Sequence, residues 1–229
     1  MKSSHDPILK AMAERALAYV QDGAVVGLGS GRAAIAFVHA LGERVRQGLQ
    51  VRGVPTSEAT AAVARQYGIP LIGLEDTESI DVTIDGADEV DPHLDLIKGY
   101  GGALVREKIV AAASRREIIL VGSEKLVPVL GTRGILPVEV IPFAVAFCTR
   151  RLAALGCRPQ LRMADSHPFV SDVGNYILDC GVDPIAEPKK LDDAVRAIPG
   201  VVGTGLFLDV AERVLVGGPA GVRELVRQP

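Results

Sequence analysis

The sequence predicts an α/β protein in which a parallel, helix-covered sheet is followed by a smaller α/β unit of the ferredoxin-like type. Up to about residue 134, short apolar runs alternate with amphipathic helical segments, as in a parallel sheet with crossover helices. Aromatic residues make up only 4% and tryptophan is absent, so Ala, Val, Ile and Leu must form the core, as is typical of parallel strands under helices. Beyond residue 134 the order becomes strand–helix–strand–strand–helix–strand, which indicates the ferredoxin-like unit.

Periodicity and capping signals predict the elements of the first part. Ile80, Val82 and Ile84 alternate with polar residues, which predicts a strand that ends at Asp85. A helix that runs to residue 67 can be capped by Thr56 or Ser57. The expected strands are 24–28, 51–54, 69–72, 80–85 and 118–121, and the other expected helices are 7–20, 32–46 and 103–114.

The second part contains the smaller unit and a return to the first sheet. Its expected strands are 138–140, 160–163, 176–180 and 201–207, with helices at 143–155 and 190–197. A last strand at 213–216 and a helix at 221–227 are expected to rejoin the first sheet. We therefore expect a core domain of residues 1–134 and 209–229 and a smaller domain of residues 135–208.

Composition excludes several functional classes. The 25 basic and 28 acidic residues give a net charge of −3 without any Lys/Arg run, so no nucleic-acid partner is expected. No stretch approaches the ~20 apolar residues of a membrane span, and residues 1–6 lack the apolar stretch of a signal peptide. Cys148, Cys157 and Cys180 form no metal-type pair, and we interpret them as buried thiols of a cytoplasmic protein.

Four candidate features follow the predicted ends of strands or open a helix. They are the glycine turn at 29–31, the acidic motif at 85–89, the glycine run at 99–102, and residues 123–125. Ligands of open parallel sheets gather where strands end, near a switch in topology. Together, the four features predict one site for acid/base chemistry on a small phosphorylated or carboxylated molecule.

The glycine turn opens the helix predicted at 32–46 and suits an anion. Backbone N–H groups can approach a phosphate there, and the helix dipole favours negative charge. The turn is not the dinucleotide fingerprint G-x-G-x-x-G, because Arg32 stands at the third glycine position. The alternative for the turn is a tight strand–helix connection that binds no ligand. For Arg32, a phosphate contact and a solvated arginine of the first helical turn both remain open.

Glu107 is the strongest single candidate for catalysis. It shares the apolar stripe of its predicted helix, whereas Arg106 and Lys108 fall off that stripe. A carboxylate on a buried face needs a partner or a task, and burial favours the proton-bound form that a general base must reach. The alternative is a structural ion pair with Lys98 or Arg106.

Asp85, Asp88 and Lys98 complete the candidate acid/base group. Turn aspartates commonly bond only the local backbone, but beside Lys98 they are plausible proton carriers. Lys98 stands directly before the glycine run, which favours ligand contact over a surface position, and Lys125 is a weaker candidate of the same kind. The neighbouring residues Glu89 and Asp91 are expected to face solvent.

These motifs together resemble the ribose-5-phosphate isomerase A family over nearly the whole chain. The matching stretches are residues 27–31, 85–89, 98–108, 136–142, 171–179, 198–202 and 205–207. The resemblance implies a Rossmann-like core with a smaller α/β lid domain, and a homodimer or a dimer of dimers. It implies interconversion of ribose 5-phosphate and ribulose 5-phosphate, through an enediolate and without metal or organic cofactor.

The resemblance also implies residue roles. Glu107 would move a proton between C2 and C1, Asp85 would assist ring opening, and Asp88 and Lys98 would hold sugar hydroxyls, with Lys98 stabilising oxyanion charge. The residues expected to bind the sugar phosphate, with the phosphate at the 30–33 turn and Lys125, are Ser30, Gly31, Arg32, Ala33, Gly86, Ala87, Gly99, Tyr100, Gly101 and Lys125.

The chain departs from the family pattern at three places. Arg32-Ala33 replaces Ser-Thr, which removes two hydroxyls and adds a guanidinium able to bind phosphate in bidentate fashion. Tyr100 replaces a glycine, although tyrosine does not easily take a positive φ, and the family's Asp-Asn-Gly-Asn has Val173 at its second position. These departures bear on substrate affinity and phosphate geometry more than on reaction type.

Two other functions compete with the isomerase. A sugar-phosphate sensor of related fold would need a DNA-binding helix-turn-helix, yet only one helix is expected before Val25. A nicotinamide-dependent oxidoreductase would need the dinucleotide fingerprint, which Arg32 interrupts.

Overall fold

The computed structural model describes residues 6–228, so residues 1–5, which carry most of the signal-peptide prediction, lie outside the described residues. The chain forms two compact units. The first unit comprises the residues up to Ala87, Arg106–Lys125 and those from Val210 onward; the second comprises Asp88–Val105 and Leu126–Asp209. The second unit is thus larger than the predicted small domain, because it also includes residues 88–105 and 126–134.

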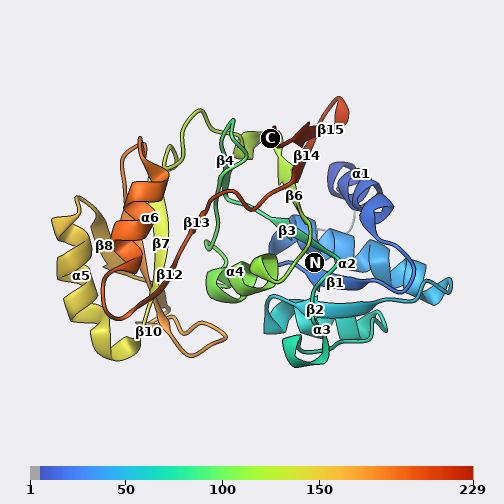
Figure 1. The fold of residues 1–229 in the computed structure, drawn as a ribbon, viewed down its shortest axis with the longest axis horizontal. Helices are drawn as coiled ribbons and strands as arrows, with labels where there is room; N and C mark the ends of the chain where they lie inside the picture. The colour runs from blue at the N-terminus through green and yellow to red at the C-terminus, as the bar shows by residue number, and fades with distance from the viewer. Residues whose placement is uncertain (1–5, 229) are drawn as a thin grey trace. The chain divides into compact units, whose positions relative to one another are not determined.

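The first unit is built on a six-stranded sheet in the order β15-β14-β6-β3-β1-β2. Strands β2, β1, β3, β6 and β14 run parallel, and β15 pairs antiparallel with β14. In Figure 1 the red strands β14 and β15 lie beside the green strand β6, although β14 and β6 are far apart in the sequence. The strands are β1 (Val25–Leu28), β2 (Arg52–Pro55), β3 (Val82–Gly86), β6 (Glu117–Gly122), β14 (Arg213–Gly218) and β15 (Gly221–Val226).

Helices cover both faces of this sheet, as the near-continuous apolar strands predict. Val26 and Leu28 of β1 pack with Phe37 and other residues from α1, α2 and α3 on one face. The alternate residue Val25 packs with Val110 of α4 on the other face. The helices are α1 (Pro7–Ala16), α2 (Gly31–Arg46), α3 (Glu58–Gln66) and α4 (Leu104–Ala112), with short 3-10 turns at Leu17–Tyr19, Leu74–Asp76 and Ser123–Lys125.

The helix predicted at 221–227 is wrong, because this segment is strand β15. Gly218 and Gly221 are register partners, so a two-residue turn folds the segment back onto β14 as a hairpin. Glu224 then pairs with Arg213 of β14 and with Arg15 of α1. These cross-strand contacts and the β-branched valines at its two ends outweigh a helical periodicity that is weak over seven residues.

The strand predicted at 69–72 is also wrong. Leu71 makes a single parallel bridge to Gly53, and the backbone of Gly53 bonds with Pro70 and Ile72 on either side of it. Pro70 has no N–H to donate to a ladder, so pairing stops after one bridge.

The second unit contains the predicted ferredoxin-like arrangement. Its four-stranded antiparallel sheet has the order β12-β7-β11-β8. Helices α5 and α6 pack on one face of this sheet, against alternate residues such as Val138 of β7 and Leu178 of β11. The elements are β7 (Ile135–Val140), the 3-10 turn Pro142–Ala144, α5 (Val145–Ala154), β8 (Arg158–Leu161), β11 (Tyr176–Gly181), α6 (Pro188–Arg196) and β12 (Val201–Thr204).

Very short strands complete the second unit, and of these only the residues of β13 and the first residue of β9 fell within predicted strands. β4 (Glu89–Val90), β5 (Leu96–Ile97) and β13 (Leu206–Phe207) form a three-stranded sheet, and β9 (Met163–Ala164) pairs with β10 (His167–Pro168). The single strand predicted at 201–207 is therefore two strands in different sheets. They divide at Gly205, where a Cβ would lie 2.4 Å from the carbonyl oxygen of Lys98.

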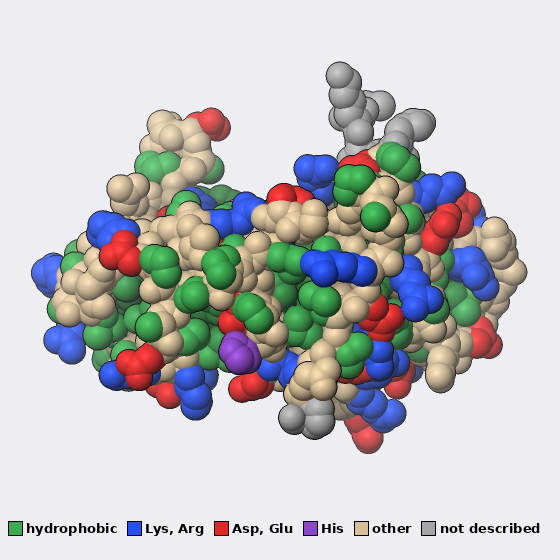
Figure 2. Space-filling view, turned by 90° about the horizontal axis from the view of Figure 1, so that it is seen from above, with side chains coloured by type: hydrophobic (Ala, Val, Ile, Leu, Met, Phe, Trp, Pro, Cys, Tyr) green, Lys and Arg blue, Asp and Glu red, His purple; other side chains and the backbone are tan. Residues whose placement is uncertain are grey.

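Charges of both signs are mixed over the face shown in Figure 2, without a single large basic patch on that face. Among residues 6–228, no helix is long and apolar enough to cross a membrane.

Candidate active site

The first group of predicted site residues lies in the first unit, where strands β1, β2 and β3 end together. Leu28 pairs with Pro55 on one side and with Ile84 on the other. The residues that follow therefore lie at one edge of the sheet, and these residues include Ser30 and Asp85. The predicted co-location of the glycine turn and Asp85 is confirmed within this unit.

Asp85 is fixed by backbone donors at the end of β3. It is 1% exposed, and its Oδ1 accepts hydrogen bonds from the backbone N–H of Ser30 at 2.9 Å and of Gly86 at 2.7 Å. Gly29 permits this approach, because a Cβ there would lie 2.3 Å from Asp85 Oδ1 and 2.4 Å from its Cα. Gly29 is thus required because any side chain at this position would overlap with Asp85.

Ser30 lies at the centre of a cluster of hydroxyl groups. Its Oγ is 2.8 Å from Thr56 Oγ1 and 2.9 Å from Ser57 Oγ, and Thr60 Oγ1 donates to the Gly29 carbonyl. Thr56, Ser57 and Thr60 are all buried, although the sequence pattern predicted only a capping role for the first two. Ser57 does cap α3, accepting from the Thr60 N–H at 3.1 Å. The run of hydroxyls directly after β2 was the signal that could have identified them.

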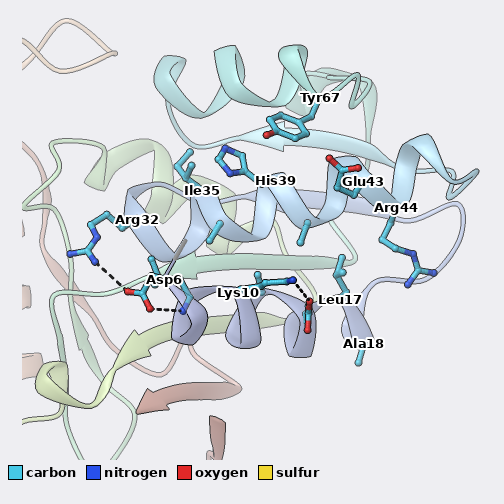
Figure 3. Close-up of a pocket in the computed structure, with 15 residues that line it drawn as sticks. Asp6, Lys10, Leu17, Ala18, Arg32, Ile35, His39, Glu43, Arg44 and Tyr67 are labelled. Carbon is cyan, nitrogen blue, oxygen red and sulfur yellow. Dashed lines mark hydrogen bonds and ion pairs between the residues drawn. The ribbon is translucent and has the colours of Figure 1, made fainter. Parts of the chain in front are cut away.

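Gly31, Arg32 and Ala33 form the first turn of α2. Gly31 has a φ of +87°, and Ser30 at the N-cap makes no capping hydrogen bond with its side chain. Arg32 extends away from the helix with its side chain 78% exposed, and its Nη2 lies 3.8 Å from Asp6 Oδ2 (Figure 3). This ion pair stands at one end of a groove of about 670 Å³ between α1 and α2.

Glu107 is on the buried face of its helix, as predicted. It is 6% exposed, whereas Arg106 and Lys108 on either side are partly exposed. Arg106 pairs with Glu58 at 2.8 Å and donates to the carbonyl of Pro55 at 3.2 Å. α4 leads into β6, which runs parallel to β3, so its first turn lies toward the edge where these strands end. Glu107 is in that first turn.

Lys125 and the pair Gly86-Ala87 belong to the same edge of the sheet. Gly86 is the register partner of Leu120 in β6, and Lys125 ends the 3-10 turn that follows β6. Gly86, Ala87 and Lys125 are all partly exposed. The first unit therefore brings its predicted residues to the carboxyl ends of β1, β3 and β6.

The second group of predicted residues lies in the second unit, on the β4–β5 hairpin. Glu89 pairs with Ile97, so Asp88 and Lys98 are the next residues of the two strands at the open end of the hairpin. The Asp88 N–H donates to the Ile97 carbonyl at 2.8 Å. The ten-residue spacing between Asp88 and Lys98 is thus the length of a hairpin that carries one of them on each strand, next to its last pair.

Lys98 is 2% exposed, so it is not a surface lysine. Its N–H donates to the Gly205 carbonyl at 2.9 Å, and its Nζ lies 5.5 Å from the centre of the Phe207 ring. A cation over an aromatic face is stabilised by the ring quadrupole. Strand β13 therefore supports Lys98 both through its backbone and through Phe207.

Tyr100 fits the glycine run without strain, contrary to the concern raised by the sequence. Gly99 and Gly102 take positive φ values of +107° and +86°, whereas Tyr100 is not among the residues with positive φ. Its N–H donates to Asp88 Oδ2 at 3.0 Å and its hydroxyl to the Ile135 carbonyl at 3.2 Å. Burial raises the pKa of the Tyr100 hydroxyl above its usual value. Gly101, the next residue, is exposed.

The prediction that Glu89 and Asp91 face solvent is wrong. Glu89 is fully buried and accepts from the N–H groups of Gly131 at 2.6 Å and Arg133 at 2.7 Å. Asp91 accepts from the N–H groups of His93 and Asp95, both at 2.9 Å, and closes the β4–β5 hairpin. Both carboxylates satisfy backbone donors of turns, which explains their burial.

The third departure, at residues 172–175, lies on a turn held by a buried glutamate. Glu139 of β7 accepts from Ser171 Oγ at 2.7 Å and from Asn175 Nδ2 at 3.2 Å. Burial raises the pKa of Glu139. Val173, where the family pattern has asparagine, is exposed, so this replacement leaves the contacts of the turn with Glu139 in place.

Sequence and fold comparisons now identify the family. The profile described as Ribose 5-phosphate isomerase A (phosphoriboisomerase A) matches residues 52–221. The chain belongs to this family. It is 52% identical to the ribose-5-phosphate isomerase A of Roseiflexus castenholzii over 216 residues, which cover 93% of this chain and 92% of the relative.

Solved structures of ribose-5-phosphate isomerases agree with this assignment. The enzyme of Plasmodium falciparum matches with a TM-score of 0.93 and 34% identity, covering 97% of this chain and 99% of that one. Another D-ribose-5-phosphate isomerase, in complex with phospho-erythronic acid, has a TM-score of 0.93 and 38% identity over 96% of this chain and 98% of that one. The ribose-5-phosphate isomerase A fold predicted from the motifs is therefore confirmed.

Ribose-5-phosphate isomerase A enzymes are aldose–ketose isomerases that interconvert ribose 5-phosphate and ribulose 5-phosphate in the pentose phosphate pathway. The chain has this activity as a member of the family, which favours the isomerase over the sensor and the oxidoreductase. Within residues 6–228, no group of three or more His, Cys, Asp or Glu side chains is arranged to hold a metal ion.

Proposed function

We propose that Glu107 is the general base that carries the proton between C2 and C1 of the substrate, through an enediolate. The observation that carries this proposal is a carboxylate that is 6% exposed in the first turn of α4, on the side of the sheet edge where Asp85 is held. Burial strengthens a carboxylate as a base, because it disfavours the charged form.

Asp85 assists opening of the furanose ring in this proposal. Ring opening needs a group that exchanges protons with the ring oxygen and the C1 hydroxyl. The two backbone N–H bonds to Oδ1 fix the carboxyl group in one orientation. Proton transfer requires the reacting groups to be held in the correct geometry, and a carboxyl group fixed in this way is suited to it.

Asp88 and Lys98 hold the sugar hydroxyls, and Lys98 stabilises negative charge that develops on an oxygen as the enediolate forms. Support comes from the hairpin, which carries one of the two residues on each strand next to the Glu89–Ile97 pair, and from the burial of Lys98. A cation in a place with little water stabilises an oxyanion more than it would in solution. Gly86, Ala87, Gly99, Tyr100 and Gly101 would line the sugar through their backbone.

The phosphate is proposed to bind the first turn of α2, with Lys125. The Ser30 hydroxyl bonds to Thr56 and Ser57 instead of capping α2, which leaves the N–H groups at 31–33 to an anion. Arg32 would exchange its exposed ion pair with Asp6 for the phosphate, since such pairs contribute about 0–1 kcal/mol. The phospho-erythronic acid bound to a related isomerase is likewise a phosphorylated sugar derivative.

The test is turnover of ribose 5-phosphate by purified protein in EDTA. We expect the wild type to form ribulose 5-phosphate and Glu107→Gln to lose about 10²–10⁴-fold in kcat, the usual contribution of a general base. Glu58→Gln is the matched control, because Glu58 is an exposed carboxylate of the same unit. Wild-type turnover by a folded Glu107→Gln variant would contradict the proposed mechanism. Loss of wild-type activity in EDTA would contradict the proposed absence of a metal cofactor.

We infer that the enzyme is a homodimer or homotetramer that associates through its second unit. Phe143 is 100% exposed, and Ile141, Phe147 and Val202 near it are also exposed. Exposed apolar groups of this kind mark association surfaces. Light scattering should show an oligomer for the wild type and a monomer for Phe143→Asp, while Leu74→Asp in the first unit leaves the mass unchanged. An oligomer of unchanged mass in Phe143→Asp would contradict this surface.

A cytoplasmic location is the remaining part of the proposal. Cys148, Cys157 and Cys180 are all buried free thiols, as is usual in a reducing compartment. Recovery of the protein in the cytoplasmic fraction of cells would support this location, and recovery in a secreted fraction would contradict it.

A further inference from the structure

Arg162 makes a set of contacts in the second unit that the proposed reaction does not yet use. It follows β8, and its Nε and Nη2 form a paired contact with the carboxylate of Asp179 on β11, at 2.8 and 2.5 Å. The remaining nitrogen, Nη1, donates to the carbonyl of Gly99 at 3.0 Å and to that of Tyr100 at 3.2 Å. One planar guanidinium thus joins the four-stranded sheet to the glycine run after Lys98.

The contact with Gly99 acts on Asp88 through a single peptide group. The Gly99 carbonyl and the Tyr100 N–H belong to the same planar trans peptide, in which C=O and N–H point in opposite directions. Arg162 binds the carbonyl side, and Asp88 Oδ2 accepts from the N–H side at 3.0 Å. A charged donor on the carbonyl also polarises the peptide and strengthens the bond on its other side.

The same geometry fixes the next peptide. With the Tyr100 carbonyl turned to Arg162, the N–H of Gly101 must point away from the guanidinium. Gly101 itself is exposed. Arg162 therefore contacts the carbonyls of two consecutive peptides, and the Gly102 N–H also donates to the first of them at 3.0 Å.

We propose that Arg162 is a positioning residue for isomerisation: it orients the Asp88 carboxylate and the peptides at 99–101 by holding the carbonyls of Gly99 and Tyr100. This inference rests on the proposed role of Asp88. The guanidinium is itself held from two sides, by Asp179 and by Phe169, whose ring centre is 5.7 Å away. A lysine could not serve both the carboxylate and the two carbonyls, because it has a single nitrogen instead of a planar fork.

A double-mutant cycle between Arg162→Met and Asp88→Asn tests this coupling. We expect Arg162→Met to lower kcat/KM about 10–100-fold, as displacement of a reacting group does, chiefly through kcat. In the Asp88→Asn background the same change should cost less than about threefold, because the group that Arg162 orients is already altered. Equal losses in the two backgrounds would overturn the proposal.

Arg158→Met is the matched control, since Arg158 lies on the same strand β8 and pairs with the exposed Asp183 at 3.1 Å. It should keep wild-type kcat/KM. If Arg162→Met folds poorly because Asp179 loses its partner, Arg162→Met/Asp179→Asn removes that charge and should regain stability but not activity. Recovery of wild-type activity in the double variant would overturn the proposal.

Hydrogen exchange of the Tyr100 amide gives a readout that is independent of turnover. Arg162→Met should speed its exchange relative to wild type, and Arg158→Met should not. Unchanged exchange of this amide in Arg162→Met would overturn the proposal. Wild-type activity in Asp88→Asn alone would instead contradict the proposed role of Asp88 in the reaction. In that case, faster exchange of the Tyr100 amide in Arg162→Met would show that the contact of Arg162 with the peptide still holds.

Discussion

The two groups of proposed site residues are held in place by different means. Asp85 in the first unit is held by the N–H groups of Ser30 and Gly86, at the common end of parallel strands. Asp88 and Lys98 in the second unit lie on a short hairpin whose supports come from far along the chain. The Lys98 N–H donates to the Gly205 carbonyl. Arg162 donates to the carbonyl of the Gly99–Tyr100 peptide, whose N–H donates to Asp88.

This difference shows that the first group depends on its local sequence and the second on supports that are remote in the sequence. A parallel sheet places whatever follows its strands at one edge, so a few residues of local sequence suffice there. β4 and β5 are two residues each and cannot hold a geometry alone. We therefore expect the first group to be sensitive to small changes in its own turn, and the second to changes at distant supports.

Removing Lys98 should have the largest effect on the second group. Lys98→Met keeps an unbranched side chain, one atom shorter, but removes the charge, and we expect kcat to fall about 10²–10³-fold, as for the loss of one oxyanion donor. Lys190→Met is the control, because Lys190 is exposed on α6 in the same unit. Steady-state kinetics measures both, and a KM effect without a kcat effect would contradict the oxyanion role.

Gly29→Ala should break the first group from within its turn. The added Cβ would meet Asp85 Oδ1 at 2.3 Å, so we expect a loss of about 1–3 kcal/mol in the free energy of unfolding together with lower kcat. Gly23→Ala is the control: Gly23 has a φ of +81° but open space around it, so only backbone strain is added. Urea unfolding gives the comparison. Equal stability losses and equal activities would show that the contact with Asp85 is not important.

Glu139→Gln should have the smallest effect on stability, and this effect should depend on pH. Burial raises the pKa of Glu139, so above its ordinary value of 4.5 the folded protein holds more protons than the unfolded chain. The free energy of unfolding should therefore fall as pH rises from 4.5 through the raised pKa of Glu139. This fall should be smaller in Glu139→Gln. Glu187→Gln, at an exposed site of the same unit, should follow the wild type, and equal pH slopes in all three would contradict the assignment.

The first group of residues could be predicted from sequence because its causes are local. Period-two alternation places Asp85 at the end of β3, and the helical stripe places Glu107 on the buried face of α4. The glycine turn follows β1 directly. Each of these signals lies within a few residues of the group that it positions.

The second group could be predicted only in part. Asp88 and Lys98 were identified, but the supports are remote: Arg162 is 63 residues from Gly99, and Glu89 accepts from Gly131, 42 residues away. No local pattern encodes such a contact, so Glu89 was expected at the surface. The same cause explains the error at 221–227, where pairing with β14 overrides local periodicity.

The measurement that most directly tests the central claim is the exchange of substrate hydrogen with solvent deuterium. Ribose 5-phosphate would be incubated in deuterated water with wild type, Glu107→Gln or Glu58→Gln, and deuterium at C1 of the ribulose 5-phosphate and at C2 of the remaining substrate followed by NMR. We predict incorporation with wild type and Glu58→Gln, and a loss of both exchange and isomerisation by about 10²–10⁴-fold in Glu107→Gln. Exchange at the wild-type rate in Glu107→Gln would contradict the assignment of this buried carboxylate as the base.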